Sequence, residues 1–532
     1  MNNKIKVGKI IEVNFPNKNK VETENNNLNI KGGILGQIVE VKQSRGKKGK
    51  LLKVLEKSSL EKLQGCIHTE CGGCSYDTLI YEDEVKYKKE MLKKLFEEAG
   101  FNFDFNLIGN SHYKSYRNKM EYTFGDEYKG SPIALGLHKK NKFYEIENTT
   151  HCQIVHQDFN KIRFFTRDFF DQEEFYNRRT HEGVLRHLVI RRTNFGEILI
   201  NLVTTKNHTL DLKSYTEGLL KLDTEAKIVG ITNTLNDSYS DAIVNEGFEV
   251  LYGRDYCVEE LLGLKFKIGP FSFFQTNSYS AETLYKLAQK LIGNIENKNV
   301  LDLYSGTGTI TQIMAQKANT AVGVEIVESA VKDAWENAKL NNIENVEFIA
   351  DDVLKALDNL DFVADVIVLD PPREGIHPKA LEKILSREPE EILYISCNPV
   401  SFVRDLEKIK EEGYEVKKIC GLDQFPRTNH VETVALLSKL NTEHHLDIEI
   451  GEDELSEIDF SKEATYGEIK KFVLDKYGLK VSSLYIAQVK RKHGLIEREN
   501  YNFSKKENQR VPNCPEEKEK AIEDALKWFG MI

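Results

Sequence analysis

The sequence predicts a multidomain protein built around an α/β domain of the Rossmann-like, doubly wound type. Short apolar segments alternate with helical segments from about residue 266 onward, which is the pattern of such a domain. Short alternating strands precede this region, and a helical stretch follows it. The 532 residues suffice for three or four domains of about 150 residues each. We expect a β-barrel, a mixed α+β central domain, the α/β domain, an acidic linker and a small helical extension, over residues 1–60, 61–265, 266–440, 441–461 and 462–532.

Composition and charge limit the possible function classes. The chain is 40% hydrophobic and 30% charged, which is typical of a soluble globular protein. Neither an apolar run of membrane-spanning length nor the apolar core of a signal peptide occurs, so we expect a cytoplasmic protein without a membrane partner. The net charge of −10 by itself argues against a nucleic-acid partner, but residues 1–60 carry 13 Lys and Arg against 5 Glu. The stretch Lys42–Lys50 is a candidate phosphate contact, with a solvated loop as the alternative.

The amino-terminal half reads as β-structure. Residues 1–60 alternate apolar and polar side chains in short runs separated by turn residues, which predicts a small antiparallel barrel. The segment "RHLVIRRTNFGEILINLVTT" (Arg186–Thr205) predicts a hairpin that turns at Asn194-Phe195-Gly196.

Five short apolar strands are predicted in the α/β domain, with helical segments such as "ESAVKDAWENAKLNN" between them. This alternation predicts a parallel sheet. The strands are Asn299–Gly306, Thr320–Val327, Asn345–Asp352, Ala364–Pro372 and Glu390–Pro399.

The carboxyl-terminal region begins with an acidic stretch and continues as helices. Residues 441–460 hold eight Asp and Glu and neither Lys nor Arg, which is typical of a linker. Thr465 and Glu468 form a capping box, and Gly478 ends the first predicted helix. A second helix, "SSLYIAQVKRKHG", ends at Gly494. Because residues 462–510 carry surplus positive charge, the helix pair is either an RNA-binding module or a docking domain.

A glycine-rich turn and two acidic strand ends predict a nucleoside site. "DLYSGTGT" (Asp302–Thr309) lies between a strand and a helix, where glycines let a ligand approach the backbone. Glu325 ends the next strand and can accept both ribose hydroxyls, and Asp352 ends the third strand, where it could bind an adenine amino group. NAD prefers G-x-G-x-x-G, and this chain lacks the third glycine. S-adenosylmethionine has no pyrophosphate and does not need it, so it is the favoured ligand, with a turn that binds nothing as the alternative.

The fourth strand ends in Asp370-Pro-Pro-Arg373. Methyltransferases that act on amino groups commonly carry an aromatic residue in the last position, which would stack on the target base. Arginine there favours contact with a phosphate or a base edge instead.

Cys397 ends the fifth strand, and therefore lies at the same carboxyl edge of the sheet as the acidic residues. A thiolate beside a methyl donor suggests covalent activation of a pyrimidine: addition to C6 makes C5 nucleophilic, and the C5 proton must then leave to a base. Glu432 is the candidate base, because the "TVALL" that follows it reads as a strand returning to the sheet. Taken singly, Cys397 could be a buried structural cysteine and Glu432 a surface carboxylate.

These motifs together resemble the S-adenosylmethionine-dependent RNA uridine C5-methyltransferases of the bacterial 23S rRNA type. The amino-terminal barrel looks like the TRAM domain, an OB-like barrel fused to many members. The resemblance covers roughly residues 1–440. The matching stretches are "FFQTN" (Phe273–Asn277), "DLYSGTGT", "GVE" ending at Glu325, "DPPR" (Asp370–Arg373), "SCNP" (Ser396–Pro399) and "FPRTNHVE" (Phe425–Glu432).

The resemblance implies a role for each matching position. Cys397 would add to uracil C6 and Glu432 would remove the C5 proton. Phe273 would stack near a flipped-out base and Arg117, in "YRNKMEY", would contact RNA. His430 would shape its loop. The residues that would hold the cofactor are Gln275, Tyr304, Glu325, Asp352 and Asp370.

Four cysteines, Cys66, Cys71, Cys74 and Cys152, have spacing that suits an iron–sulfur cluster or structural zinc. The spacing alone favours a plant-type two-iron cluster, and unliganded thiols are the alternative. The resemblance instead implies a [4Fe-4S] cluster, although family members usually have five residues in the first gap and this chain has four. Since the chemistry needs no redox step, the cluster would fold the domain or contact RNA. Cys257, Cys420 and Cys514 are expected to be structural.

We therefore expect an S-adenosylmethionine-dependent, monomeric enzyme that methylates C5 of a uridine in structured RNA. We expect 23S rRNA as the target, because simpler tRNA enzymes lack the barrel and the cysteines; tRNA is the nearest variant. A cytosine C5-methyltransferase would need Pro-Cys or Thr-Cys-Ser, which "SCNP" does not match. A non-catalytic iron–sulfur RNA-binding protein is the alternative from another class.

Overall fold

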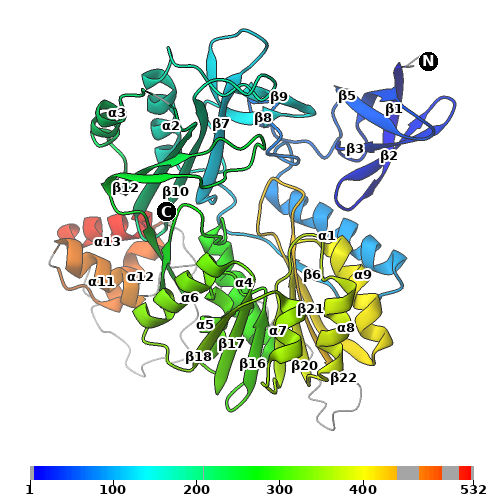
Figure 1. Cartoon of the computed structure of the whole chain (residues 1–532), viewed down its shortest axis with the longest axis vertical. Coiled ribbons are helices and arrows are strands. Elements are labelled where there is room, and N and C mark those ends of the chain that lie inside the picture. Colours follow the sequence, from blue (N-terminus) through cyan, green and yellow to red (C-terminus); the bar gives the residue numbers. More distant parts are fainter. Residues whose placement is uncertain (1–4, 208, 440–465, 478, 494–513, 529–532) are drawn as a thin grey trace, which may run out of the picture. The chain divides into compact units, whose positions relative to one another are not determined.

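The computed structural model in Figure 1 describes residues 5–207, 209–439, 466–477, 479–493 and 514–528. The chain divides into two compact units, Met1–His445 and Leu446–Ile532, which are described separately. Within the described residues, none of the helices is long and apolar enough to cross a membrane.

The amino-terminal strands form a five-stranded antiparallel sheet, as predicted. The sheet has the order β3-β2-β1-β4-β5 and curls so that Asn29 on β3 bridges to Lys48 beside β5. Alternate side chains, such as Ile10, Val21 and Val39, fill its interior. Its identity as a TRAM or OB-like barrel stays a prediction. The strands are β1 (Ile5–Asn14), β2 (Lys18–Thr23), β3 (Asn27–Lys31), β4 (Ile38–Gln43) and β5 (Gly49–Glu56).

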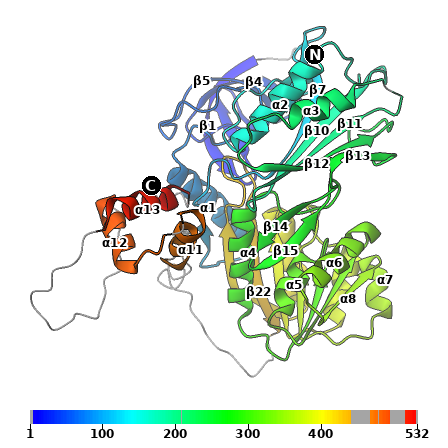
Figure 2. The ribbon, with the colours of Figure 1, turned by 90° about the vertical axis from the view of Figure 1, so that its left-hand side faces the viewer.

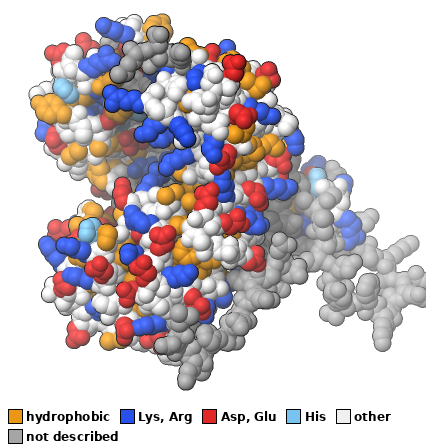
Figure 3. Space-filling model, turned by 90° about the vertical axis from the view of Figure 1, so that its right-hand side faces the viewer, with side chains coloured by type: hydrophobic (Ala, Val, Ile, Leu, Met, Phe, Trp, Pro, Cys, Tyr) orange, Lys and Arg blue, Asp and Glu red, His pale blue; other side chains and the backbone are white. Residues whose placement is uncertain are grey.

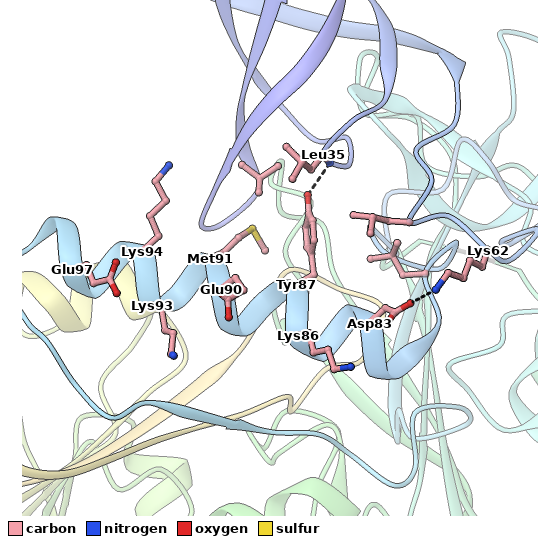
Figure 4. Close-up of a pocket in the computed structure, with 13 residues that line it drawn as sticks. Leu35, Lys62, Asp83, Lys86, Tyr87, Glu90, Met91, Lys93, Lys94 and Glu97 are labelled. Atoms are coloured by element: carbon pink, nitrogen blue, oxygen red, sulfur yellow. Dashed lines mark hydrogen bonds and ion pairs between the residues drawn. The ribbon is translucent and has the colours of Figure 1, made fainter.

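This sheet rests on one face of α1 (Tyr81–Glu98), and an open groove of about 750 Å³ lies between them. Figure 4 shows Tyr87 pointing from α1 toward the sheet, where its hydroxyl accepts a hydrogen bond from the Leu35 amide at 3.0 Å. Glu12 of β1 pairs with Lys94 of α1 at 2.6 Å. Polar contacts thus attach the sheet to α1, and apolar side chains such as Val13, Leu79 and Met91 line the groove between them.

A seven-stranded mixed sheet follows, in the order β13-β12-β11-β10-β7-β8-β9. Helices α2 (Gln157–Phe169) and α3 (Leu212–Leu219) pack on it (Figure 2). The predicted hairpin is confirmed, because β10 and β11 pair antiparallel. The strands are β7 (Lys119–Asp126), β8 (Ile133–Lys139), β9 (Lys142–Glu147), β10 (Leu185–Arg192), β11 (Glu197–Thr204), β12 (Lys227–Leu235) and β13 (Phe248–Gly253).

The α/β region forms an eight-stranded sheet in the order β18-β17-β16-β19-β20-β22-β21-β6. The five predicted strands are present and parallel: β16 (Asn299–Leu303), β17 (Thr320–Glu325), β18 (Val346–Ala350), β19 (Val366–Leu369) and β20 (Glu391–Ser396). The predicted returning strand β22 (Glu432–Lys439) pairs antiparallel with β20 and with β21 (Tyr414–Leu422), so the sheet is mixed.

Helices flank this sheet, and a small hairpin precedes it. Helices α7, α8 and α9 pack side by side, and α4 packs against α5. The helices are α4 (Ser278–Ile292), α5 (Thr309–Ala315), α6 (Glu328–Leu340), α7 (Val353–Asn359), α8 (Pro378–Ser386) and α9 (Pro399–Glu411). The hairpin strands are β14 (Cys257–Leu261) and β15 (Leu264–Ile268).

Two early segments join this sheet although they belong to the expected central domain. Strand β6 (Asn106–Ile108) pairs with β21 at the sheet edge, and α1 packs against α9. Residues 61–265 therefore do not form a spatially separate region. The domain boundaries stay a prediction.

The second unit has a helical core of its own, as expected for the extension. Helices α11 (Tyr466–Tyr477), α12 (Ser483–Lys492) and α13 (Glu516–Trp528) bury a small cluster of side chains that includes Ile469, Ile486 and Ile522. The predicted linker 441–461, together with Thr465, Gly478 and Gly494, lies outside the described residues.

Candidate active site

The carboxyl ends of the parallel strands bring the predicted acidic residues to one edge of the sheet. Asp302 lies near the end of β16 and Glu325 ends β17. Asp370 and Cys397 directly follow β19 and β20. Because these strands are parallel neighbours, the four side chains belong to the same rim.

The glycine-rich turn folds tightly onto β17. Tyr304 has a φ of 69°, and the amides of Tyr304 and Ser305 both donate to the Val324 carbonyl at 3.0 Å. Glu325 accepts from the Gly306 amide at 3.0 Å, which ties its carboxylate to the turn. Gly308, with φ 71°, has no room for a side chain, because a Cβ would lie 2.5 Å from the Phe348 ring. The turn therefore presents backbone beside an acidic strand end, which suits a nucleoside ligand.

Asp352 lies close enough to Tyr304 at this rim for its charge to affect the Tyr304 hydroxyl. Asp352 caps α7 by accepting from the Leu354 amide at 3.0 Å. Burial, and then the charge of Asp352, raise the pKa of Tyr304 to about 12. The two residues can therefore bound one ligand position.

The register of β20 and β22 sets Cys397 opposite Glu432. Ser396 pairs with Thr433 in this antiparallel ladder, so the next residue on each side, Cys397 and Glu432, meets at the strand ends. The Cys397 loop is tied to the loop after β19, because the Asn398 amide side chain donates to the Arg373 carbonyl at 2.7 Å. The backbone therefore brings together the Cys397 thiol, the Glu432 carboxyl and the loop that carries Arg373.

Burial shifts the ionisation of these groups. Burial and the charge of Asp370 raise the pKa of Glu432 to about 8. Burial, together with the charges of Glu432 and Asp370, raises the pKa of Cys397 to about 12. Arg373 opposes the shift in both groups. At neutral pH burial therefore favours a protonated thiol at Cys397 and a protonated carboxyl at Glu432.

Gln275 belongs to the same neighbourhood. The Gln275 side-chain oxygen accepts a hydrogen bond from the side-chain amide of Gln424 at 3.1 Å. Tyr285 also hydrogen-bonds to the Gln275 side chain. Burial raises the pKa of Tyr285, and the charges of Asp370, Asp302 and Glu432 contribute to the shift. Gln275 is thereby connected to the rim through Tyr285.

The two predicted RNA-contacting residues lie at different levels of burial. Phe273 is 69% exposed, so its ring is free to meet a ligand. Arg117 precedes β7 and its guanidinium donates to the Lys119 carbonyl at 3.0 Å.

Burial and then the charges of Arg373, Lys88 and Arg117 lower the pKa of His430 to about 4. His430 is therefore neutral at physiological pH and lies within reach of these cations.

A buried ionic network holds the loop before Glu432, and sequence reasoning missed it. Lys88 of α1 pairs with Glu84 at 2.7 Å and with Asp423 at 2.8 Å, and all three side chains are fully buried. Arg427 pairs with Glu84 at 3.0 Å and its amide donates to the same carboxylate at 2.6 Å. In sequence, Glu84 and Lys88 look like a solvent-exposed i,i+4 pair, so only their tertiary partners reveal them.

The four predicted ligand cysteines gather beside the seven-stranded sheet. Cys74 and Cys152 pack against its core. Burial raises the pKa of Cys152 to about 11, and the charges of Cys71 and Cys66 contribute. The described residues nevertheless hold no set of three His, Cys, Asp or Glu side chains arranged to bind a metal ion. The donor chemistry of four nearby thiols fits a thiolate-bound group, and the cluster stays a prediction.

Comparison with known proteins identifies the class and then the family. Residues 245–440 match the family model described as tRNA (Uracil-5-)-methyltransferase. An RNA methyltransferase of Caldanaerobacter subterraneus subsp. tengcongensis is 47% identical over 442 residues, covering 81% of this chain and 98% of that protein. One of Clostridium tetani is 43% identical over 443 residues, covering 81% and 97%.

A solved structure extends the likeness to the fold. Pyrococcus abyssi tRNA (uracil-54, C5)-methyltransferase, in complex with S-adenosyl-L-homocysteine, is similar with a TM-score of 0.65 at 25% identity. The match covers 81% of this chain and all of that one. The chain belongs to the RNA uracil-5-methyltransferase family.

Proposed function

We propose that this enzyme transfers the methyl group of S-adenosylmethionine to C5 of a uridine in structured RNA through a covalent bond between Cys397 and C6. The observation that carries the proposal is the register of β20 and β22, which sets Cys397 against Glu432 beside Asp370. A nucleophile and a base at the carboxyl edge of the sheet are what C5 methylation of a uracil requires.

The donor site is proposed at the glycine-rich turn. Glu325 would accept the ribose hydroxyls and Asp352 would meet the adenine amino group. Gln275, Tyr304 and Asp370 would hold the rest of the molecule near Cys397. S-adenosylmethionine supplies an electrophilic methyl group on a sulfonium. The Pyrococcus abyssi enzyme, whose structure holds S-adenosyl-L-homocysteine, supports S-adenosylmethionine as the donor.

Each reacting group then has one task. The Cys397 thiol first loses its proton to solvent. The resulting thiolate bonds to C6, which moves electron density onto the C4 oxygen and C5. C5 takes the methyl group as the sulfonium carbon–sulfur bond breaks. Glu432 acts in its ionised form, which Arg373 and the cationic donor favour. It accepts the C5 proton, and the bond between Cys397 and C6 breaks to restore the ring. Arg373 favours the ionised forms of Cys397 and Glu432, because its charge lowers the pKa of both.

RNA is proposed to reach the site with the target base flipped out. Phe273 is exposed enough to stack on such a base, and Arg117 would contact the RNA. Figure 3 shows Lys and Arg side chains gathered beside the hollow on one face of the molecule, as a polyanionic ligand would require.

The proposed target is 23S rRNA, with tRNA as the second candidate. The barrel and the cysteine segment motivated the choice of rRNA. The tRNA alternative is favoured by the Pyrococcus abyssi tRNA enzyme, because its likeness covers 81% of this chain and so extends beyond the α/β domain.

The deciding experiment uses rRNA and tRNA from cells that lack this protein. With labelled S-adenosylmethionine, the enzyme should label one class of RNA, and digestion should release the label as 5-methyluridine. Label in 5-methylcytidine, or none in either RNA, would contradict the proposal. Sedimentation of the purified enzyme tests the proposed monomer.

Two variants test the roles of the thiol and the carboxyl. Cys397→Ala should abolish methyl transfer while RNA binding remains. Glu432→Gln should trap a covalent protein–RNA adduct on denaturing gels, because the C5 proton cannot leave. The double variant should form no adduct, which controls for nonspecific crosslinking. If Glu432→Gln gives no adduct, the base has been assigned wrongly.

The four cysteines are proposed to bind a [4Fe-4S] cluster with a structural role. Protein purified without oxygen should contain about four iron and four sulfide ions per chain. It should also show the broad absorption of visible light that is typical of iron–sulfur clusters. Cys74→Ser should lose this content, whereas Cys514→Ser, in the second unit, should keep it. Zinc, or a two-iron stoichiometry, would contradict the assignment.

A further inference from the structure

A cluster of exposed aromatic side chains and two arginines lies outside the site described above; Arg179 is exposed, whereas the Arg178 side chain is mostly buried. It consists of Phe143, Tyr144, Arg178, Arg179 and Tyr239, here called the aromatic–arginine surface. Phe143, Tyr144 and Tyr239 are 53%, 47% and 79% exposed. These residues come from β9 and from two loops, before β10 and after β12. The catalytic proposal uses none of them.

Cations lie over the rings of this surface. The Arg179 guanidinium is 4.3 Å from the centre of the Tyr144 ring, and that of Arg178 is 5.6 Å from the Phe143 ring. In the part of the chain that the structure describes, Arg179 forms no ion pair with a carboxylate. Its charge is therefore available to an anionic ligand.

The surface is held in place from beneath. His138 stacks on Phe143 with ring centres 5.0 Å apart and an interplanar angle of 5°. Asp241 pairs with both His138, at 3.1 Å, and Arg178. The loop that carries Tyr239 is fixed by buried Arg186, which donates to the carbonyls of three of its residues, Asn236, Ser238 and Ser240. The rings are thus exposed but preorganised, which lowers the entropic cost of binding.

We propose that the aromatic–arginine surface binds an unpaired segment of the substrate RNA, away from the uridine that is methylated. Rigid, exposed rings interleaved with guanidinium groups stack on bases and contact phosphates, which is how proteins hold single-stranded nucleic acid. The membership of this chain in an RNA-modifying family favours RNA over a protein partner. This inference rests on RNA being the substrate, as proposed above.

The test compares steady-state kinetics of three variants on the RNA that the wild-type enzyme methylates. Tyr144→Ala, Arg179→Ala and Tyr239→Ala should each raise KM for RNA roughly five- to a hundredfold, the range for one lost base–aromatic stack, without changing kcat. Tyr144→Phe should keep the wild-type KM, since stacking needs only the ring. Tyr252→Ala is the matched control, because Tyr252 is 38% exposed on β13, at the opposite edge of the sheet.

A second measurement uses a fluorescent single-stranded uridine oligonucleotide. The same three alanine variants should bind it more weakly than Tyr252→Ala does. The inference is overturned if their KM and oligonucleotide affinity match the control, or if Tyr144→Phe loses as much as Tyr144→Ala. Loss of binding to a protein partner with unchanged KM for RNA would likewise overturn it. If the wild-type enzyme methylates no RNA, the proposed function fails instead, so the two failures are distinguishable.

Discussion

Three carboxyl groups at the rim have pKa values raised chiefly by burial. Burial raises the pKa of Asp302 and of Asp370 to about 7, and that of Glu432 to about 8. Asp302 keeps one partner, the Thr311 hydroxyl, at 2.6 Å. A bound cationic sulfonium would favour ionisation of such groups, so donor binding and charge at the rim should be linked.

Asp302→Asn should therefore stabilise the protein increasingly as pH rises. A carboxyl whose pKa is raised by folding contributes stability below its unfolded pKa of about 4, and loses it as pH rises through the folded value of about 7. The free energy of unfolding of the variant minus that of the wild type should grow by about 1.4 kcal/mol per pH unit across this window, then level off.

Urea unfolding at intervals from pH 4 to pH 9 measures this difference. Subtracting the wild type removes the contribution of buried histidines, which titrate in the same range. Asp361→Asn, at an exposed carboxyl just after α7, is the matched control, and the pH dependence of the difference should be larger for Asp302→Asn than for this control. A flat difference for Asp302→Asn would mean that Asp302 is ionised in the folded protein.

At the scale of elements, α1 and the loop before β22 are joined by buried charges. Lys88 lies between Glu84 and Asp423, and Asp423 follows Leu422, which pairs with Glu432 across β21 and β22. The Arg427 carbonyl also accepts from the Ser75 amide, next to Cys74. The loop thus connects the cysteine segment to the proposed base.

Lys88→Met should destabilise the protein by roughly 3–5 kcal/mol, because it leaves Asp423 buried without a cation and Glu84 with Arg427 as its remaining cation. Lys86→Met, an exposed position of the same helix, should cost less than about 0.5 kcal/mol. Denaturant unfolding of both variants measures the contrast. Equal losses would show that the network contributes no more than a surface lysine.

The elements that sequence predicted are those with local signals. The parallel strands and the glycine-rich turn were predicted because apolar runs and glycines mark them directly. The return of β22 to the sheet was predicted from "TVALL", and with it the position of Glu432 near the rim that carries Cys397. The antiparallel direction of β22 is a finding of the structure. The joining of β6 to the sheet and the burial of Lys88 were missed, because both depend on partners more than 300 residues away.

At the scale of the whole molecule, the two units bury separate cores. The core of the second unit is made by residues between Ile469 and Leu526. The core beneath the active site is made by residues between Phe15 and Leu437. Because each of these two described cores draws its side chains from one unit, the first unit should tolerate the loss of the second.

A chain that ends at His445 should therefore fold and keep the kcat of the full-length enzyme. Its free energy of unfolding should match that of the first unit in the full chain to within about 0.5 kcal/mol, as for independent sites. Calorimetry of the full chain should show two transitions, and the shortened chain should keep the one that shifts when S-adenosylmethionine is added, since binding stabilises only the unit that holds the ligand. A lower kcat, or a single transition in the full chain, would contradict independent folding. If the shortened chain has a raised KM for RNA and an unchanged kcat, the three helices of the second unit are an RNA-binding module and not a docking domain. Only the binding of the RNA substrate would then depend on these helices.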